Sequence, residues 1–98
     1  MKLYYKLENQ QFLEECAKGN CNAVENIFYD RPVDYRCVIK GLKMSIITGQ
    51  TEFAKWLFAR YDLKNKFNKN IILDIFEIAM ETNQYELSYW IANQCIDY

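Results

Sequence analysis

The sequence predicts an all-α chain, a short helical-repeat solenoid of about three helix-turn-helix units. Its composition is the first reason: 51% of the 98 residues are hydrophobic, with only three Gly and one Pro, which argues against disorder and against a turn-rich β-sandwich. The second reason is a phrase that occurs three times, as KGNCNAVENIFYD, TGQTEFAKWLFARY and TNQYELSYWIANQ. Aligned on Gly19, Gly49 and Asn83, each copy has apolar residues four and eight positions later. The spacings of 30 residues (19 to 49) and 34 residues (49 to 83) lie in the range of helical solenoids.

The first unit opens with residues 9–18, where Asn9 is a candidate N-cap and apolar side chains follow at helical spacing. This pattern predicts a helix of about two to three turns. Gly19 then ends the helix, because glycine adopts the left-handed conformation at little cost, and a second helix is predicted over 22–29. Pro32 closes the unit, since it has no amide with which to continue a helix.

The second unit repeats this order. A broad apolar face predicts a helix over 35–47, which Gly41 weakens modestly. Gly49 turns the chain, and a returning helix is predicted over 52–61.

The third unit follows a polar, lysine-rich connector over 62–70. Helices are predicted over 71–80 and 85–96, with Asn83 in place of the turn glycine. Asparagine tolerates the left-handed region better than other non-glycine residues, so this replacement agrees with the pattern.

The chain is long enough for one domain with one modest core. We therefore expect a single domain over residues 1–98, with units at approximately 9–31, 35–62 and 70–97. About three units is the lower limit for a stable stack, since each unit exposes an apolar face that its neighbour must cover. The alternative is an irregular six-helix bundle in which the recurrence of the phrase is coincidental.

The three phrases resemble the second helix of the ankyrin repeat, which begins with Gly and a polar residue and continues with aliphatic pairs. GNCNAVENIF, GQTEFAKWLF and NQYELSYWIA match this pattern, and Phe12, Leu42 and Phe76 stand where the family places a Leu seven residues before the turn. The family's Thr-Pro-Leu-His phrase and the Asp-Gly signal of its β-hairpins are absent from the sequence. The resemblance therefore implies a divergent ankyrin-like array with short loops, of the kind that large DNA viruses and some intracellular bacteria carry.

The charge and the N-terminal sequence narrow the functional classes. With 12 basic and 13 acidic residues the net charge is −1, which gives no global field that favours nucleic acid or an anionic membrane. The N-terminus lacks the apolar run of a secretory signal, and no window approaches the roughly 18 apolar residues of a membrane span. We therefore expect an intracellular, cytoplasmic protein, inside a host cell if it is viral. In that reducing compartment the cysteines are expected to be free thiols; they are Cys16, Cys21, Cys37 and Cys95.

The sequence offers no recognisable catalytic or metal-binding motif. A nucleophilic cysteine needs a base, which is usually histidine, and the chain has no His. A zinc site would need close cysteine pairs such as CxxC, and the four cysteines form none. We therefore expect a protein without catalytic residues, cofactor or metal ion.

The resemblance to ankyrin repeats implies that a protein partner binds the concave face lined by the first helices and their connectors. On the family pattern, positions just before the turn and one helical turn earlier face this groove, and the first connector adds three more. The implied partner-binding residues are Lys18, Arg31, Tyr35, Arg36, Lys43, Thr48, Glu77 and Thr82. Their mixed charge suits a protein partner better than DNA, and the protein would act on that partner as an inhibitor or an adaptor.

Three other surfaces are alternatives. The apolar ends KLYYKL and YWIANQCIDY favour self-association into a homodimer. Trp56 and Trp90, each seven residues after its turn, offer a second surface on the outer helices, although packing between units is the favoured interpretation. The connector LKNKFNKN, with three lysines around Phe67, is a weak signal for nucleic acid.

Overall fold

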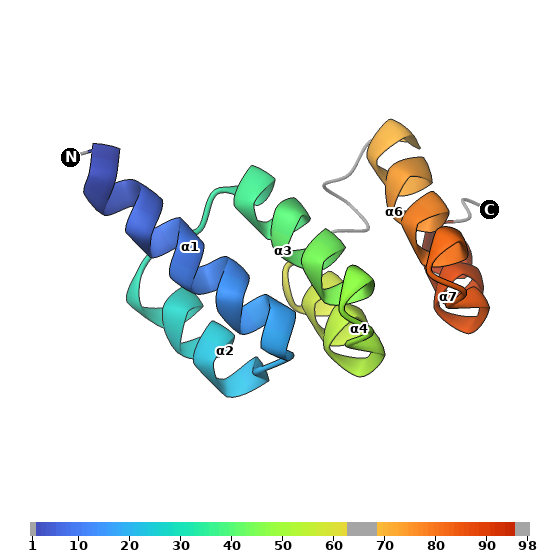
Figure 1. Ribbon diagram of the computed structural model, residues 1–98, viewed down its shortest axis with the longest axis horizontal. Helices are drawn as coiled ribbons and strands as arrows, with labels where there is room; N and C mark the ends of the chain where they lie inside the picture. Colours follow the sequence, from blue (N-terminus) through green and yellow to red (C-terminus); the bar gives the residue numbers. More distant parts are fainter. Residues whose placement is uncertain (1, 63–68, 96–98) are drawn as a thin grey trace.

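A computed structural model describes residues 2–62 and 69–95 of the chain, and the side chains of residues 9–62 and 69–94. This part of the chain forms six helices and no strand (Figure 1). The helices are α1 (Lys2–Lys18), α2 (Cys21–Asp30), α3 (Tyr35–Ile47), α4 (Thr51–Arg60), α6 (Lys69–Glu81) and α7 (Tyr85–Cys95). The predicted all-α class is therefore confirmed. None of these helices is both long and apolar enough to cross a membrane.

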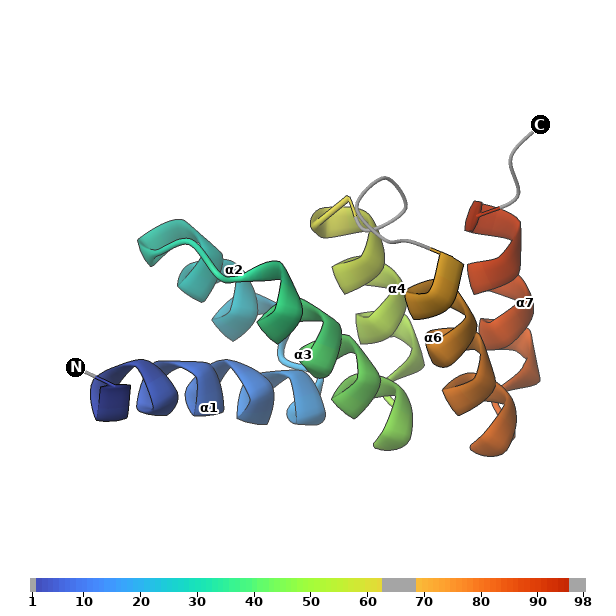
Figure 2. The same cartoon turned by 90° about the horizontal axis from the view of Figure 1, so that it is seen from above.

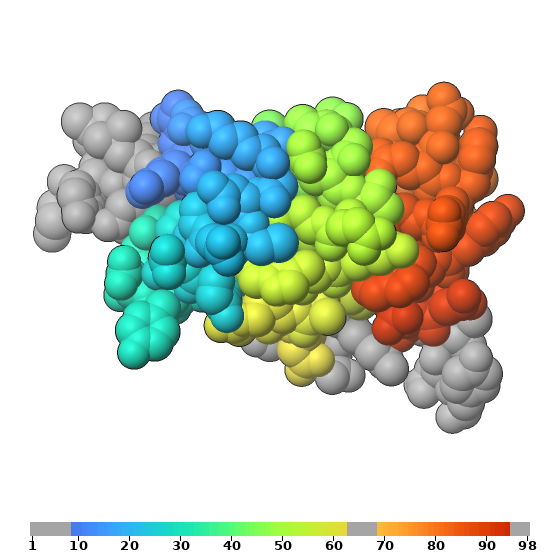
Figure 3. All heavy atoms as spheres, turned by 90° about the horizontal axis from the view of Figure 1, so that it is seen from below, coloured from blue at the N-terminus to red at the C-terminus, as the bar shows by residue number. Residues whose placement is uncertain are grey.

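The helices pair into three hairpins that stand side by side. α1 packs against α2, α3 against α4, and α6 against α7. Seen from above, the first helices α1, α3 and α6 form one row, and the second helices α2, α4 and α7 form the row behind it (Figure 2). α3 lies between α1 and α6 and contacts both, while α2 contacts α4. Figure 3, seen from below, shows the three hairpins following one another across the molecule, from blue through green and yellow to red.

The three hairpins share one turn conformation. Gly19, Gly49 and Asn83 have positive φ angles of 71°, 79° and 63°. In each turn the N–H of this residue donates to the carbonyl three residues earlier (3.0–3.1 Å), and the next N–H donates to the carbonyl five residues before it (2.8–3.0 Å). These are the two hydrogen bonds of the Schellman motif, which satisfies carbonyls at a helix C-terminus. The predicted turns are confirmed, including the left-handed conformation of Asn83.

The prediction that the first helix begins near Asn9 is wrong. α1 begins at Lys2, so Asn9 lies in the middle of the helix and is not its N-cap. The reason is local: residues 2–8, KLYYKLE, contain no Gly or Pro, and Leu, Lys and Glu are strong helix formers. The bounds of the other predicted helices agree with the structure to within two residues, apart from Ile96, which lies outside the described residues.

The connector between α2 and α3 is a short loop. Arg31 is extended (φ −158°, ψ 153°), the conformation that Pro32 favours in the residue before it. The Asp34 carboxylate accepts a hydrogen bond from the Arg36 N–H (2.9 Å) and thereby caps α3. The expected short loop in place of a β-hairpin is therefore observed here, whereas residues 63–68 of the next connector lie outside the described part of the chain.

One hydrophobic core joins the three hairpins, with contributions from every helix. Two serines are buried with it, and each donates within its own helix at 2.7 Å, Ser45 Oγ to Leu42 O and Ser88 Oγ to Tyr85 O. Hydrogen bonding of this kind is what makes a buried hydroxyl tolerable in an apolar core. The largest fully buried apolar side chains are Phe12, Leu42, Ile46, Leu57, Ile75, Leu87 and Ile91.

Candidate interaction surface

Two glutamines fix each hairpin onto the one before it, and both follow the left-handed residue of their turn. Gln50 Nε2 donates to Ala17 O in α1 (3.4 Å). Gln84 Nε2 donates to the carbonyl of Ile46 in α3, and Gln84 Oε1 accepts from Thr51 Oγ1 (3.1 Å). Because these bonds tie each turn to the C-terminal part of the preceding first helix, they hold α1, α3 and α6 in one row.

Polar and aromatic contacts also join the second helices. Arg60 Nε lies 2.7 and 3.0 Å from the two carboxylate oxygens of Glu25, and the guanidinium lies 5.3 Å from the ring centre of Phe28. Tyr61 OH donates to Val33 O (2.6 Å). Glu25 and Arg60 are about half exposed, so their ion pair contributes little energy; its main effect is to orient α4 on α2.

Trp90 packs between hairpins. Its ring lies edge-on to Phe58 with 5.5 Å between the ring centres, and Lys55 Nζ lies 5.9 Å from the Trp90 ring centre. Trp56 lies 5.5 Å from Phe53 of its own helix and is half-buried against the core. The packing interpretation is therefore confirmed for Trp90, while Trp56 packs within its own hairpin.

The first helices each expose one stripe. Beyond Tyr35, the exposed residues of α3 recur at i, i+4, i+8 and i+11, which places them on one side of the helix. Because α1, α4 and α6 cover the other sides of α3, this stripe faces away from the second row. Corresponding stripes run along α1 and α6, and we call the three stripes together the first-helix face. Its exposed residues are Gln10, Gln11, Glu14 and Lys18 in α1, Arg36, Lys40, Met44 and Ile47 in α3, and Leu73, Asp74, Glu77 and Glu81 in α6.

Charge is distributed unevenly over the first-helix face. α3 contains three basic residues and no acidic one, whereas α6 contains one basic and three acidic residues. The basic residues of α3 are Arg36, Lys40 and Lys43, and the acidic residues of α6 are Asp74, Glu77 and Glu81. Among the described residues, none of these six side chains forms an ion pair. A basic stripe on α3 therefore lies beside an acidic stripe on α6.

Exposed apolar side chains complete this face. Met44 is 39% exposed and Ile47, one turn further along α3, is 57% exposed. Leu73 on α6 is 56% exposed. A partner that covers them removes apolar surface from water, which is the dominant favourable term in most protein association. The family pattern missed all three residues, although a helical projection would have placed Met44 and Ile47 in line with Arg36.

Three of the predicted partner-binding residues lie at the turn ends. Lys18 is exposed, with its Nζ 3.6 Å from Glu15 Oε1. The Thr48 and Thr82 hydroxyls each donate to the carbonyl four residues earlier, at 2.9 and 2.8 Å. Both protons bond within their own helix, and Thr82 Oγ1 also accepts from Gln84 Nε2 (2.9 Å). Neither hydroxyl is therefore free to donate to a partner.

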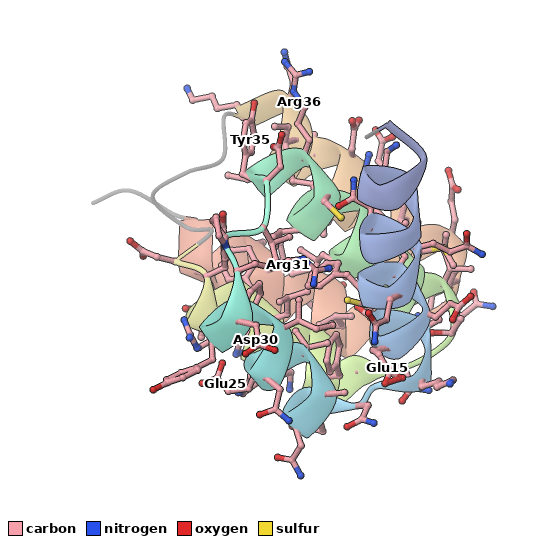
Figure 4. The ribbon with its side chains drawn as sticks, turned by 90° about the vertical axis from the view of Figure 1, so that its left-hand side faces the viewer. Glu15, Glu25, Asp30, Arg31, Tyr35 and Arg36 are labelled. Carbon is pink, nitrogen blue, oxygen red and sulfur yellow. The ribbon has the colours of Figure 1, made fainter. Side chains whose placement is uncertain are left out.

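The remaining predicted residues lie in different surroundings. Lys43 is half-buried beside the α3 stripe, and Glu77 is exposed on α6. Tyr35 and Arg36 are exposed at the start of α3, whereas Arg31 is half-buried and directed toward α1 (Figure 4). The expected outward projection therefore holds for Tyr35 and Arg36 and not for Arg31. Since a helix of 13 residues spans about 20 Å, the two ends of α3 belong to one face but not to one compact site.

A recess lies between α1 and α3, next to the N-terminal end of the basic stripe. Its volume is about 190 Å³, below the roughly 300–1,000 Å³ of sites that bind small molecules. Leu13 and Cys37 supply its apolar lining, and Arg36 and Lys40 are its cationic residues. Asn9 and Asp34 complete the lining.

The described cysteines are free thiols. Burial raises the pKa of Cys16 to about 12 and also raises the pKa of Cys37. Cys21 is half-buried, and Cys95 lies outside the described side chains. A thiol that stays protonated at neutral pH is a poor nucleophile and a poor metal ligand. Within the described residues, no group of three or more His, Cys, Asp or Glu side chains is placed to hold a metal ion.

Several predicted features lie outside the described side chains. They include the apolar side chains of KLYYKL, Ile96 at the other end, and most of the lysine-rich connector around Phe67. Of the connector lysines, Lys69 is described, and it is exposed at the start of α6. The alternatives that depend on these side chains stay predictions.

Comparisons of the chain with protein-family models, with curated proteins and with solved structures give no match. The resemblance to ankyrin repeats therefore stays a prediction from the three sequence phrases. The contacts, exposure and charge of the described residues are therefore the observations that bear on function.

Proposed function

We propose that this protein is a non-enzymatic interaction module, an ankyrin-like array of three helical repeats that binds another protein through the first-helix face. The repeat is supported by the common turn conformation of Gly19, Gly49 and Asn83. It is also supported by Gln50 and Gln84, which follow their turns and tie each hairpin to the preceding one. Repeats stacked in this way generate an extended surface from equivalent positions.

The observation that carries the proposed binding function is the exposed pair Met44 and Ile47, which belongs to the basic stripe of α3 beside the acidic stripe of α6. Protein interfaces combine an apolar centre with a polar rim, and complementary charges fix the orientation of a partner. Nucleic acid suits this face less well, because its phosphates would meet the carboxylates of α6 beside the cations of α3. A protein partner can match both stripes.

Replacement of Met44 and Ile47 by serine tests the proposed binding function. Burial of each apolar side chain contributes about 1.5–3 kcal/mol, and about 1.4 kcal/mol corresponds to tenfold in affinity. We expect the double variant to recover its partner from native cell extract at least about tenfold less than the wild-type protein. Affinity purification with quantitative mass spectrometry measures the recovery.

Tyr29→Ser is the matched control, because Tyr29 is 92% exposed on α2 in the other row. This variant is expected to recover the same proteins as the wild type, and all variants are expected to keep their helical circular dichroism. Equal recovery by the Met44/Ile47 double variant and the control would contradict binding through the first-helix face.

Self-association is a second candidate function, and two tyrosines of α7 favour it. Six positions after the turn residue, Glu25 of the first hairpin pairs with Arg60, and Lys55 of the second lies over Trp90. Two positions after its turn residue, Thr51 of the second hairpin bonds to Gln84. The corresponding residues of the third hairpin are Tyr85 and Tyr89, which are 49% and 61% exposed. The third hairpin thus presents a docking surface rich in tyrosine, a residue enriched at interfaces.

At the opposite end of the row, the corresponding described positions on α2 are polar. Asn26 is exposed on α2 at the position that Trp90 occupies in the third hairpin. Asp30 is exposed on α2 at the position that Arg60 occupies in the second hairpin. This end therefore does not complement the tyrosine surface, and a two-fold dimer that pairs the two α7 surfaces is favoured over a head-to-tail filament.

Tyr89→Glu tests the dimer. Burial of an unpaired carboxylate costs several kcal/mol, so we expect the dissociation constant of the dimer to rise at least about a hundredfold. Light scattering over a series of protein concentrations measures it, with Tyr29→Glu as the control for an exposed tyrosine outside the surface. A wild-type protein that stays monomeric at the highest soluble concentration would exclude this candidate.

A further inference from the structure

The charge pattern of the first-helix face restricts the kind of protein segment that can bind along α3. Arg36 and Lys40 are exposed and Lys43 is half-buried, and among the described residues none of them has an acidic partner. The nearby Asp34 carboxylate is engaged at one oxygen in capping α3 (2.9 Å to the Arg36 N–H). At the recess the two cations Arg36 and Lys40 outnumber the one carboxylate, Asp34. With Lys43 as a third cation on α3, the stripe has a net positive charge that complements carboxylates.

The acidic stripe of α6 sets one boundary of this surface. Asp74, Glu77 and Glu81 are exposed along the C-terminal two turns of that helix, and they repel carboxylates that come near. On the other side, α1 exposes the neutral Gln10 and Gln11 at the level of the recess. Further along the same stripe it exposes Glu14 and Lys18, one charge of each sign. An acidic segment is therefore directed to α3 and its border with α1, and away from α6.

Apolar contacts are available at two places along the same stripe. The recess between α1 and α3 has a volume of about 190 Å³ and is lined by Leu13 and Cys37, with Arg36 and Lys40 as its cationic residues. A cavity of about 150 Å³ is large enough for benzene, so the recess can take one leucine or phenylalanine side chain. About one and two helical turns beyond Lys40, Met44 and Ile47 offer a second apolar contact.

We propose that the first-helix face binds an acidic protein segment with two large apolar side chains, one for the recess between α1 and α3 and one for Met44 and Ile47. This inference rests on the proposed function, since it names the partner of the same face. The stripe from Arg36 to Ile47 is about 16 Å long, which corresponds to about five residues of an extended segment or about three turns of a helix.

A phage-displayed library of random dodecapeptides is the probe. Selection on the immobilised wild-type protein is expected to enrich peptides with several Asp or Glu residues around large apolar side chains. The consensus peptide is then synthesised, and its dissociation constant is measured by fluorescence anisotropy with the wild-type protein and its variants. Because the attraction is between exposed charges, we also expect the affinity to fall as salt is raised.

The matched charge variants are Lys40→Glu and Lys69→Glu. Both lysines are exposed on helices of the first row, and both changes alter the net charge by the same amount. Lys40→Glu is expected to raise the dissociation constant at least tenfold, and Lys69→Glu is expected to change it less than twofold. Arg36→Glu changes the other cationic residue of the recess and is expected to raise the dissociation constant as much as Lys40→Glu does. Circular dichroism identifies any variant that does not fold.

The outcomes separate this inference from the proposed function. Some peptides could bind the wild-type protein but not the Met44/Ile47 serine variant, and yet contain no acidic residues or bind the Lys40→Glu variant equally well. Such peptides would contradict the proposed acidic segment and would still support binding at the first-helix face. Peptides that bind all the variants equally overturn both. A library that yields no enriched peptide also contradicts the inference, because the inference specifies a linear segment. The affinity purification with the Met44/Ile47 variant then still tests whether whole proteins bind the first-helix face.

Discussion

Leu57→Ala is expected to lower the free energy of unfolding by about 2–5 kcal/mol. Leu57 has no exposed surface and belongs to the core that joins the three hairpins. Its truncation removes apolar contacts and leaves a cavity that close-packed neighbours fill only in part. Since each kcal/mol shifts the melting temperature of a domain this size by about 4–8 °C, thermal unfolding followed by circular dichroism resolves the effect.

The chain supplies a matched control for this change in Leu73. That residue is also a leucine in a helix, but it is 56% exposed, and changes at exposed positions usually stay within about 0.5 kcal/mol. Leu73→Ala is therefore expected to unfold close to the wild-type midpoint. If the two variants unfold at the same denaturant concentration, Leu57 is not the core residue that its position in the repeated phrase predicts.

The parts of the fold that depend on neighbouring residues could be predicted from the sequence. The bounds of α3 were predictable because its apolar face is continuous and the turn glycine follows directly. The left-handed Asn83 was predictable because it stands where two glycines stand in the other copies of the phrase. The start of α1 was not, since Asn9 has the side chain of an N-cap although it lies inside the helix, and residues 2–8 contain no breaker.

Contacts between residues far apart in the sequence could not be predicted. Gln84 reaches Ile46 across 38 positions and Thr51 across 33, and no local pattern indicates which carbonyl a glutamine will find. The direction of Arg31 depends in the same way on where α1 lies. For the candidate site, most positions of the family pattern lie on the same row of helices as the proposed surface. They do not include Met44 and Ile47, whose exposure depends on the packing of α3 between α1 and α6.

Gly41 shows how such a contact changes the expected result of a substitution. From the sequence, this glycine only weakens a helix, and its replacement by alanine should stabilise the protein by about 1 kcal/mol. In the structure, a Cβ added to Gly41 would lie 2.7 Å from Cys16 Sγ and 2.8 Å from Phe12 Cε2. Both neighbours are completely buried, so neither can move into solvent. Glycine is therefore required for the close approach of α1 and α3.

We expect Gly41→Ala to lower the free energy of unfolding, because the overpacking cost of about 1–3 kcal/mol exceeds the gain in helix propensity. Gly41→Leu is expected to cost at least about 3 kcal/mol, since three more carbon atoms must enter the same space. Urea unfolding measures both. Lys40→Leu, which introduces the same side chain one position away at an exposed site, is expected to stay within about 0.5 kcal/mol.

A double-mutant cycle links the loss to the α1–α3 contact itself. Cys16→Ala removes the sulfur that lies nearest to the added Cβ, so it makes room for the Gly41→Ala methyl group. The two changes are then expected to be non-additive, with the double variant more stable than the sum of the single effects by about 0.5–3 kcal/mol. Stabilisation by Gly41→Ala alone, or simple additivity with Cys16→Ala, would mean that α1 and α3 do not approach each other at Gly41 in solution.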